Sequence, residues 1–154
     1  MSHNNETDAA RPDQQVVARI GREHYTVDLS AGGHSMVADE PERAGGKDQG
    51  ANPYDYLLSG LGACIAITVR MYADRKEWPL ESVTVSLTHE KVRAGEDEDS
   101  ESESTTIDQI DCHIDVDGDL DDEQRGRLYE IAGKCPVHRT LTGTVRVNMD
   151  LVEA

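Results

Sequence analysis

The sequence predicts a single-domain α+β protein whose elements follow the order β-β-β-α-β-β-α-α-β. Three observations predict this class: short β-branched segments precede residue 39 and recur after residue 82, one long apolar segment follows Asn52-Pro53, and capped helical segments lie near the C-terminus. A chain of 154 residues can bury one core without disulfide bonds. Residues 1–14 are polar and lack apolar periodicity, so we expect a disordered tail there and the folded domain at 15–154.

The N-terminal part is predicted to form three strands and a loop. Residues 16–20 and 25–29 are rich in β-branched side chains and flank Gly21-Arg22-Glu23, a pattern typical of a hairpin. Residues 34–38 are the third predicted strand. Proline and repeated glycines make residues 39–50 a predicted loop.

A long helix is predicted from Asn52-Pro53 to about residue 77. An asparagine side chain can cap the free amides of the first turn, and proline at the first helical position loses no hydrogen bond. Apolar residues occupy nearly every side of this helix, so we expect it to be buried. Its apolar stretch, residues 56–69, is shorter than the roughly 18 to 20 residues that cross a bilayer, which indicates a core helix and no membrane contact.

The C-terminal half is predicted to contain two alternating strands, two helices and a last strand. The strands are residues 83–89, 106–116 and 144–151. The helices are residues 120–134 and a short segment after Cys135-Pro136. Between the first two strands, residues 96–103 are almost wholly acidic or serine. We interpret this insert as a solvated excursion from a hairpin, and prefer this interpretation to a phosphorylation site or a partner-binding site.

Charge and cysteine content restrict the function and the compartment. The chain has 31 acidic and 15 basic residues, a formal net charge of -16, so its surface should repel phosphates and nucleic acid is not an expected partner. Such acidity suits a protein that is kept soluble in concentrated salt. Three cysteines cannot all pair, and no secretion signal is evident, which predicts a cytoplasmic protein with free thiols.

Two of the cysteines could carry chemistry. Cys64 lies inside the apolar helix, where most cysteines merely pack, and its thiolate would need a nearby cation. Cys135 lies at a helix cap, where free amides favour thiolate. Four arginines are candidates for the cation near Cys64: Arg19, Arg22, Arg43 and Arg139. A peroxide-reducing site needs a thiolate, an apolar approach and a second thiol that resolves the sulfenic acid, and the sequence offers all three residue types.

Two motifs around these cysteines resemble the OsmC/Ohr family of osmotically inducible and organic hydroperoxide resistance proteins. The first motif comprises Gly50-Ala51-Asn52-Pro53, Leu57-Leu58 and Gly62-Ala63-Cys64. The second is Cys135-Pro136-Val137-His138-Arg139-Thr140-Leu141. The predicted element order resembles that family over roughly residues 15–152, and the flanking residues suggest a divergent subgroup.

The resemblance implies an intertwined homodimer that reduces organic hydroperoxides without a metal or organic cofactor. Cys64 would be the peroxidatic thiol and Cys135 the resolving thiol, with an external dithiol as reductant. The family also pairs an arginine with a glutamate. The arginine falls loosely on Arg22 or Arg19, and the glutamate position holds Tyr54, so that Asp55, one residue later, is the candidate substitute.

Four residues are expected to contact substrate: Tyr54, His34, His138 and Arg139. The simpler interpretations are a turn histidine at His34 and a structural histidine at His138. Other functions stay open. Tyr54 at the carboxylate position supports a non-catalytic stress or ligand-binding module, and His138 could instead serve as base to Cys135 in a thiol hydrolase.

A zinc site from Cys112-His113 and Cys135-x-x-His138 is disfavoured, because adjacent strand residues face opposite sides. Cys112 is expected to be a core residue of its strand.

Overall fold

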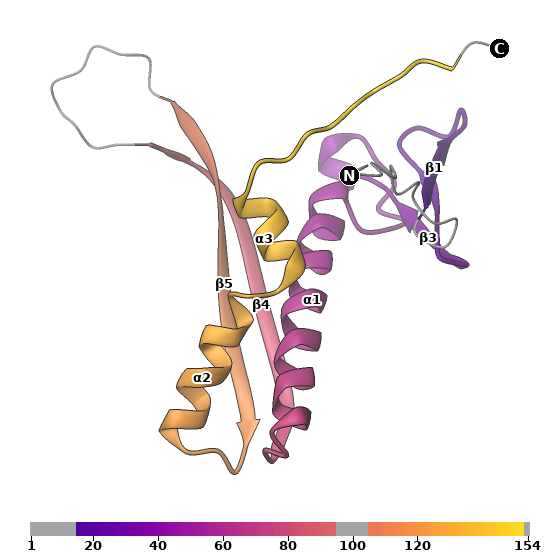
Figure 1. Cartoon of the computed structure of the whole chain (residues 1–154). Coiled ribbons are helices and arrows are strands. Elements are labelled where there is room, and N and C mark those ends of the chain that lie inside the picture. Colours follow the sequence, from indigo (N-terminus) through magenta and orange to yellow (C-terminus); the bar gives the residue numbers. More distant parts are fainter. Residues whose placement is uncertain (1–14, 95–104, 153–154) are drawn as a thin grey trace, which may run out of the picture. The chain divides into compact units, whose positions relative to one another are not determined.

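The computed structural model describes residues 15–94 and 105–152 (Figure 1). The predicted tail at 1–14 and the acidic insert at 96–103 lie outside the described residues. The chain packs as two compact units, Met1–Tyr56 and Leu57–Ala154, and each is described by itself.

The first unit contains a three-stranded antiparallel sheet in the order β1-β2-β3. Its strands are β1 (Val16–Ile20), β2 (Val27–Ala31) and β3 (His34–Ala38). The predicted second strand is displaced by two residues, because the turn after β1 extends to Thr26 and places His24 in a left-handed conformation with φ of 41°. Such a conformation interrupts a strand.

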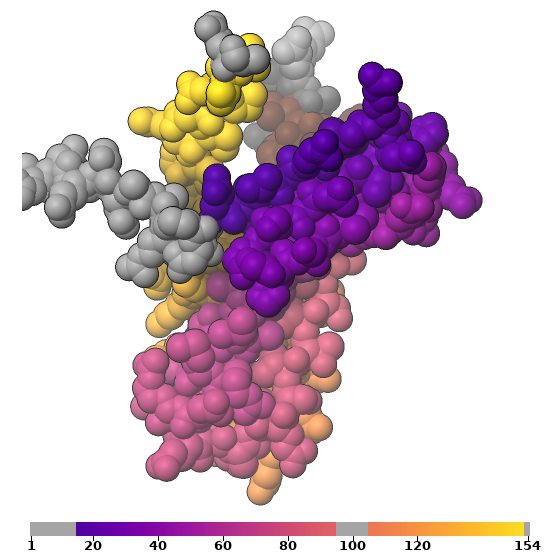
Figure 2. Space-filling view, turned by 90° about the vertical axis from the view of Figure 1, so that its right-hand side faces the viewer, coloured from indigo at the N-terminus to yellow at the C-terminus, as the bar shows by residue number. Residues whose placement is uncertain are grey.

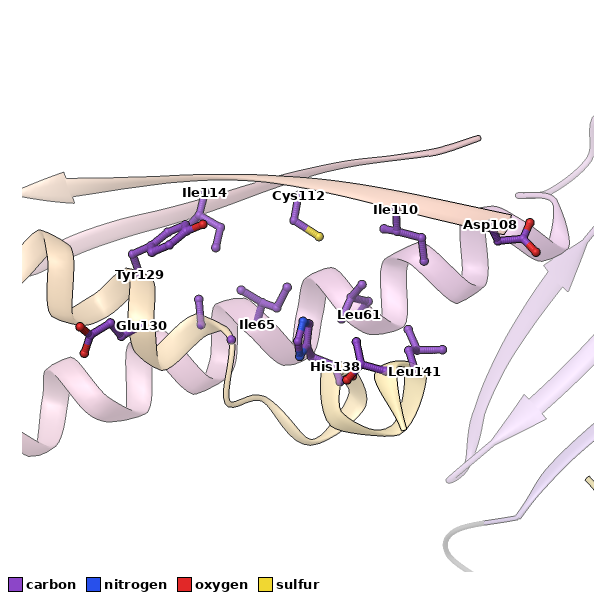
Figure 3. A pocket seen from close by; sticks show the side chains of 13 residues that line it. Leu61, Ile65, Asp108, Ile110, Cys112, Ile114, Tyr129, Glu130, His138 and Leu141 are labelled. Carbon is purple, nitrogen blue, oxygen red and sulfur yellow. The ribbon is translucent and has the colours of Figure 1, made fainter. Parts of the chain in front are cut away.

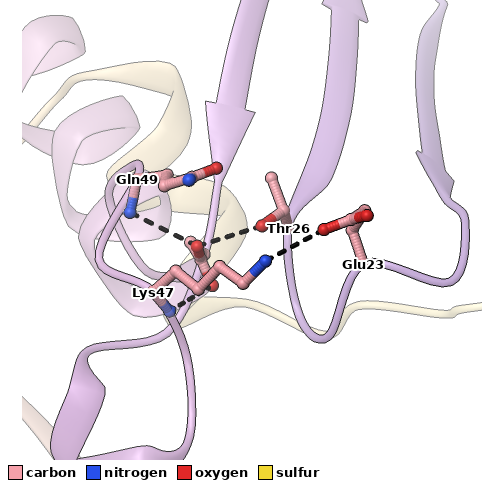
Figure 4. A network of polar contacts seen from close by, with 5 residues as sticks. Glu23, Thr26, Lys47 and Gln49 are labelled. Atoms are coloured by element: carbon pink, nitrogen blue, oxygen red, sulfur yellow. Dashed lines mark hydrogen bonds and ion pairs between the residues drawn. The ribbon is translucent and has the colours of Figure 1, made fainter.

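A buried carboxylate anchors the loop that follows β3 (Figure 4). Asp39 is 1% exposed and accepts hydrogen bonds from the Thr26 hydroxyl at 3.1 Å and the Glu40 amide at 2.7 Å. The amides of Lys47 at 3.5 Å and Gln49 at 3.3 Å donate to the same carboxylate. One side chain thereby fixes both ends of the loop, which includes the short 3-10 helix η2 (Glu42–Ala44).

The long helix α1 (Pro53–Arg75) begins where the sequence predicts. The Asn52 side-chain oxygen accepts the Asp55 amide at 2.9 Å, and the Asp55 carboxylate accepts the Asn52 amide at 3.1 Å. This reciprocal arrangement satisfies two of the amides that a helix leaves free at its start.

The second unit packs α1 and two shorter helices against a long two-stranded hairpin. The strands are β4 (Leu80–Arg93) and β5 (Thr106–Gly118), and the helices are α2 (Asp122–Ala132) and α3 (Pro136–Thr142). The core is formed by aliphatic side chains from α1, α2 and the ends of the strands: Leu61, Ile65, Val69, Ala73, Leu80, Leu120, Leu128 and Ala132, with Cys135 among them. Gly62 lets this helix approach the hairpin, because a methyl group there would press on the Leu87 side chain.

Only one face of α1 is buried, so the expectation of burial on all sides is wrong for the single chain. Leu57, Ile67 and Met71 are 41%, 59% and 57% exposed. Figure 2 shows side chains of α1, in magenta and pink, at the molecular surface. The reason is geometric: within the second unit the hairpin covers one side of a helix that is apolar on several. By length and composition alone, this 23-residue helix is long and apolar enough to cross a membrane. The core helices of soluble proteins meet the same two criteria.

The last predicted strand, 144–151, is also wrong for the single chain. Residues 144–152 form no strand and are exposed, with Val147 at 77% and Leu151 at 94%. Their alternation is that of a strand, but a strand needs a neighbouring backbone edge to bond, and the described part of the chain gives this segment none.

Candidate active site

Two cysteines that are 71 residues apart meet in the second unit. Cys64 lies at the middle of α1, is half-buried and follows the buried Leu61 by about one turn. Cys135 is fully buried at the cap position of α3, where its sulfur accepts the backbone amide of His138 at 3.2 Å. The predicted cap at Cys135 is therefore confirmed. Both thiols are free, and Cys64 packs against the core cluster that contains Cys135.

The environment of Cys135 favours the protonated thiol. Burial raises its pKa most, and the hydrogen bond to Cys64 and the charge of Cys64 raise it further. The amides of His138 and Val137 lower it, but not enough to offset burial. The amides of the helix cap thus favour the thiolate of Cys135, as expected, but burial in the apolar core outweighs them.

The arginine expected beside Cys64 stays a prediction. Arg139 is exposed in the last turn of α3. The other three candidates, Arg19, Arg22 and Arg43, belong to the first unit, whereas Cys64 belongs to the second. The pKa of Cys135 is likewise shifted by burial, by backbone amides and by the neighbouring thiol, and its causes include no arginine.

A cavity of about 480 Å³ lies in the second unit, lined in part by residues close in sequence to Cys64 and Cys135 (Figure 3). Its walls come from α1, β5, α2 and α3, and the aliphatic side chains among them are Leu61, Ile65, Ile110, Ile114, Ala132 and Leu141. Leu61 and Ile65 stand three residues before and one residue after Cys64. Neither Cys64 nor Cys135 is among the lining residues. The volume lies in the range of roughly 300–1,000 Å³ typical of small-molecule sites.

The third cysteine faces this cavity. Figure 3 shows the Cys112 sulfur pointing into the space between Ile110 and Ile114, and the residue packs against the core as expected. Burial raises the pKa of Cys112, and the charge of Asp111 adds to the effect. His113 is exposed on the opposite face of β5. Within residues 15–94 and 105–152, no group of three or more histidine, cysteine or acidic side chains is placed to hold a metal.

The other candidate residues are distributed over both units. His138 lines the cavity, so its imidazole faces the space beside the thiols (Figure 3). Asp55 caps α1 and shares with Arg43 the lining of a hollow of about 540 Å³ in the first unit. Tyr54 is 50% exposed on the first turn of α1, and His34 is exposed at the start of β3.

Sequence reasoning missed the cavity, although one signal for part of it was present. Ile110, Cys112 and Ile114 alternate along a predicted strand and must share one face. Residues of α2 that line the cavity, such as Tyr129 and Glu130, carried no such signal, because their approach to β5 depends on tertiary packing.

The profile of the family described as OsmC-like protein matches residues 46–150. No curated protein matches the chain.

Solved structures share the fold. An OsmC-like protein from Mycoplasma pneumoniae is 20% identical with a TM-score of 0.65, over 91% of this chain and 97% of that one. A putative osmotic stress induced and detoxification response protein from Psychrobacter arcticus is 20% identical with a TM-score of 0.63, over 85% and 88% of the chains. An organic hydroperoxide resistance protein of Bacillus subtilis is 20% identical with a TM-score of 0.57, over 84% and 90%.

Proposed function

This chain belongs to the OsmC-like protein family, and on that premise we propose that it reduces organic hydroperoxides with Cys64 and Cys135. The observation that carries the proposal is that both cysteines belong to one packed core, where Cys64 is close enough to raise the pKa of Cys135. An apolar cavity beside them supports an organic substrate, and a structural neighbour is named an organic hydroperoxide resistance protein.

The proposed cycle has three steps. The Cys64 thiolate attacks the terminal oxygen of the hydroperoxide, the O–O bond breaks, and the alkoxide takes a proton to leave as an alcohol while Cys64 becomes a sulfenic acid. The Cys135 thiol then condenses with this sulfenic acid, which forms the disulfide and releases water. An external dithiol reduces the disulfide by exchange and is itself oxidised.

The two environments support this division of roles. Cys64 is the more exposed of the pair, so a peroxide can reach it first. Cys135 is fully buried and its pKa is raised, which suits a thiol that stays reduced until a sulfenic acid forms beside it.

A single-turnover experiment tests the proposal. Reduced protein is mixed with cumene hydroperoxide. The loss of peroxide is measured with a peroxide assay, and the free thiols and disulfides of the protein are measured by mass spectrometry. We expect one peroxide consumed per subunit and a Cys64–Cys135 disulfide. Cys64→Ser should abolish consumption, and Cys135→Ser should leave a Cys64 sulfenic acid that dimedone traps. Unmodified thiols after excess peroxide would contradict the proposal and favour the non-catalytic module.

The thiol hydrolase remains as the second candidate, because His138 faces the cavity next to the Cys135 motif. Its nucleophile would be a buried thiol of raised pKa, which argues against it. A thioester substrate would leave an acyl group on Cys135 in that case, and the same mass spectra would show it.

We also propose a homodimer in the cytoplasm. The exposed apolar face of α1 and the unpaired residues 144–152 are surfaces that a second copy would cover. Light scattering should give twice the subunit mass of 16.9 kDa. Ile67→Asp should shift the protein toward monomer, whereas Asp74→Asn on the same helix should not.

The proposed activating arginine is tested separately. Arg22→Ala should slow the attack on peroxide and move its pH dependence upward, since a cation near Cys64 would favour thiolate. Matched Arg19→Ala and Arg43→Ala variants identify which arginine acts. If all three behave as the parent protein, no arginine of the first unit activates Cys64.

A further inference from the structure

The cavity beside the thiol pair carries acidic groups at its two ends. Asp108 of β5 lies at one end and Glu130 of α2 at the other, with aliphatic side chains between them (Figure 3). Among the described residues that line the cavity, none is lysine or arginine. His138 is the one basic side chain in this lining.

The basic side chains that contact these carboxylates are already engaged. Lys91 and His89 both contact the same Asp108 oxygen, each at 2.8 Å. Arg127 contacts Glu130 at 2.8 Å and also donates to the Tyr72 hydroxyl at 3.0 Å. Lys91, His89 and Arg127 face these partners and do not line the cavity.

We propose that this cavity binds uncharged apolar molecules and rejects carboxylates, so that the protein prefers neutral hydroperoxides to those of free acids. A carboxylate that enters an aliphatic cavity loses hydration and needs a cation in return. Here Lys91 and Arg127 are already paired with Asp108 and Glu130, and no lysine or arginine among the described residues lines the cavity, so an entering carboxylate finds no cation. The net charge of -16 adds long-range repulsion. Asp108 and Glu130 are thus specificity-determining residues, because they hold the nearby cations.

The turnover part of this inference rests on the proposed peroxidase function, whereas the binding part does not. Both are tested with matched ligands that differ only in charge. Cumene hydroperoxide is compared with its para-carboxylate as substrate, and the two corresponding alcohols are compared as ligands. Measurements at pH 8 lie above the ordinary titration range of histidine side chains.

We expect kcat/KM to favour cumene hydroperoxide over the carboxylate by at least about tenfold, and the neutral alcohol to bind with a similar preference. Chemical-shift changes on binding should appear at Ile110 and Ile114. Tyr129→Lys adds a cation at an exposed lining position and should lower the ratio of the kcat/KM values for the neutral and the carboxylate hydroperoxide. Tyr129→Gln is its uncharged control. Glu130→Gln should narrow the ratio in the same direction.

The outcomes separate the two proposals. Equal or better use of the carboxylate, or a ratio that Tyr129→Lys and Glu130→Gln leave unchanged, overturns the charge selection. If neither peroxide is consumed but the neutral alcohol still binds selectively, the peroxidase function fails and the cavity assignment stands. If neither alcohol perturbs the cavity residues, the cavity is not a ligand site.

Discussion

The two units of this chain are stabilised by opposite means. The second unit buries aliphatic side chains of α1, α2 and the β4–β5 hairpin in one cluster. The first unit has a sheet whose apolar residues are largely exposed, Val16 and Ile20 among them, and hydrogen bonds to the buried carboxylate of Asp39 anchor the loop after this sheet. An apolar core needs only removal from water, whereas a buried carboxylate needs every donor in place.

This difference shows which part of the chain is self-sufficient. The thiol pair and the cavity both belong to the unit that has its own core. The exposed sheet of the first unit is the part whose stability we expect to depend on a second copy of the chain.

The largest expected effect comes from the core of the second unit. Leu128 is fully buried, so Leu128→Ala should lower the free energy of unfolding by about 2–5 kcal/mol. Ile20→Ala, in a residue that is 51% exposed, should cost under about 1.5 kcal/mol in a monomer. Urea titrations measure both. An equal cost for the two variants would mean that the sheet of the first unit is covered in solution.

Loss of the Asp39 carboxylate should affect the first unit alone. Asp39→Ala leaves the Thr26 hydroxyl and three loop amides without their acceptor, so amide exchange at residues 39–50 should accelerate by about tenfold or more. Asp39→Asn keeps one acceptor oxygen and should have a smaller effect. Asp48→Asn, an exposed position on the same loop, is the control. Acceleration that spread through α2 would show that the two units unfold together.

Lowering the pH should destabilise the loop of the first unit, but less than removal of the Asp39 carboxylate does. Burial raises the pKa of Asp39, but its hydrogen bonds together hold the pKa below the ordinary value of 3.8. The folded carboxylate therefore binds its proton less readily than the unfolded one, and its stabilisation is full above that value and disappears as the pH falls through the folded pKa. Amides of the loop should lose protection below about pH 4. Asp39→Asn should remove this dependence, and a persistent dependence would assign it to another group.

Salt should have the smallest effect. Because repulsion among surface carboxylates is screened over about 10 Å at 0.1 M salt, the melting temperature should rise from low to molar salt. Differential scanning calorimetry measures the change. A flat or falling melting temperature would show that the acidity does not serve life in concentrated salt.

Local chemistry made much of the fold predictable. Asn52-Pro53 and Cys135-Pro136 mark helix starts, and alternation marks strands, because these signals involve only near neighbours along the chain. The strand at 144–151 and the burial of all sides of α1 were wrong, since both depend on surfaces that the single chain does not provide.

The site was only partly predictable for the same reason. The motifs singled out Cys64 and Cys135, but neither their contact nor the raised pKa of Cys135 could be derived from spacing. Asp55 shows why a residue next to a motif position is a poor guide to its role. Its carboxylate accepts the Asn52 amide at the start of α1, and this hydrogen bond competes with any bond to an arginine.

The unequal burial of the two thiols has a consequence for the reductant. In the disulfide of the proposed cycle, an incoming thiol would reach the sulfur of Cys64 and would have to expel Cys135 as leaving group. A thiol of raised pKa leaves slowly, and from its buried position it can attack the mixed disulfide again at once. A monothiol such as glutathione would therefore be returned to solution unoxidised. A molecule with two adjacent thiols can close its own ring before that reversal, and this kind of electron donor suits the site.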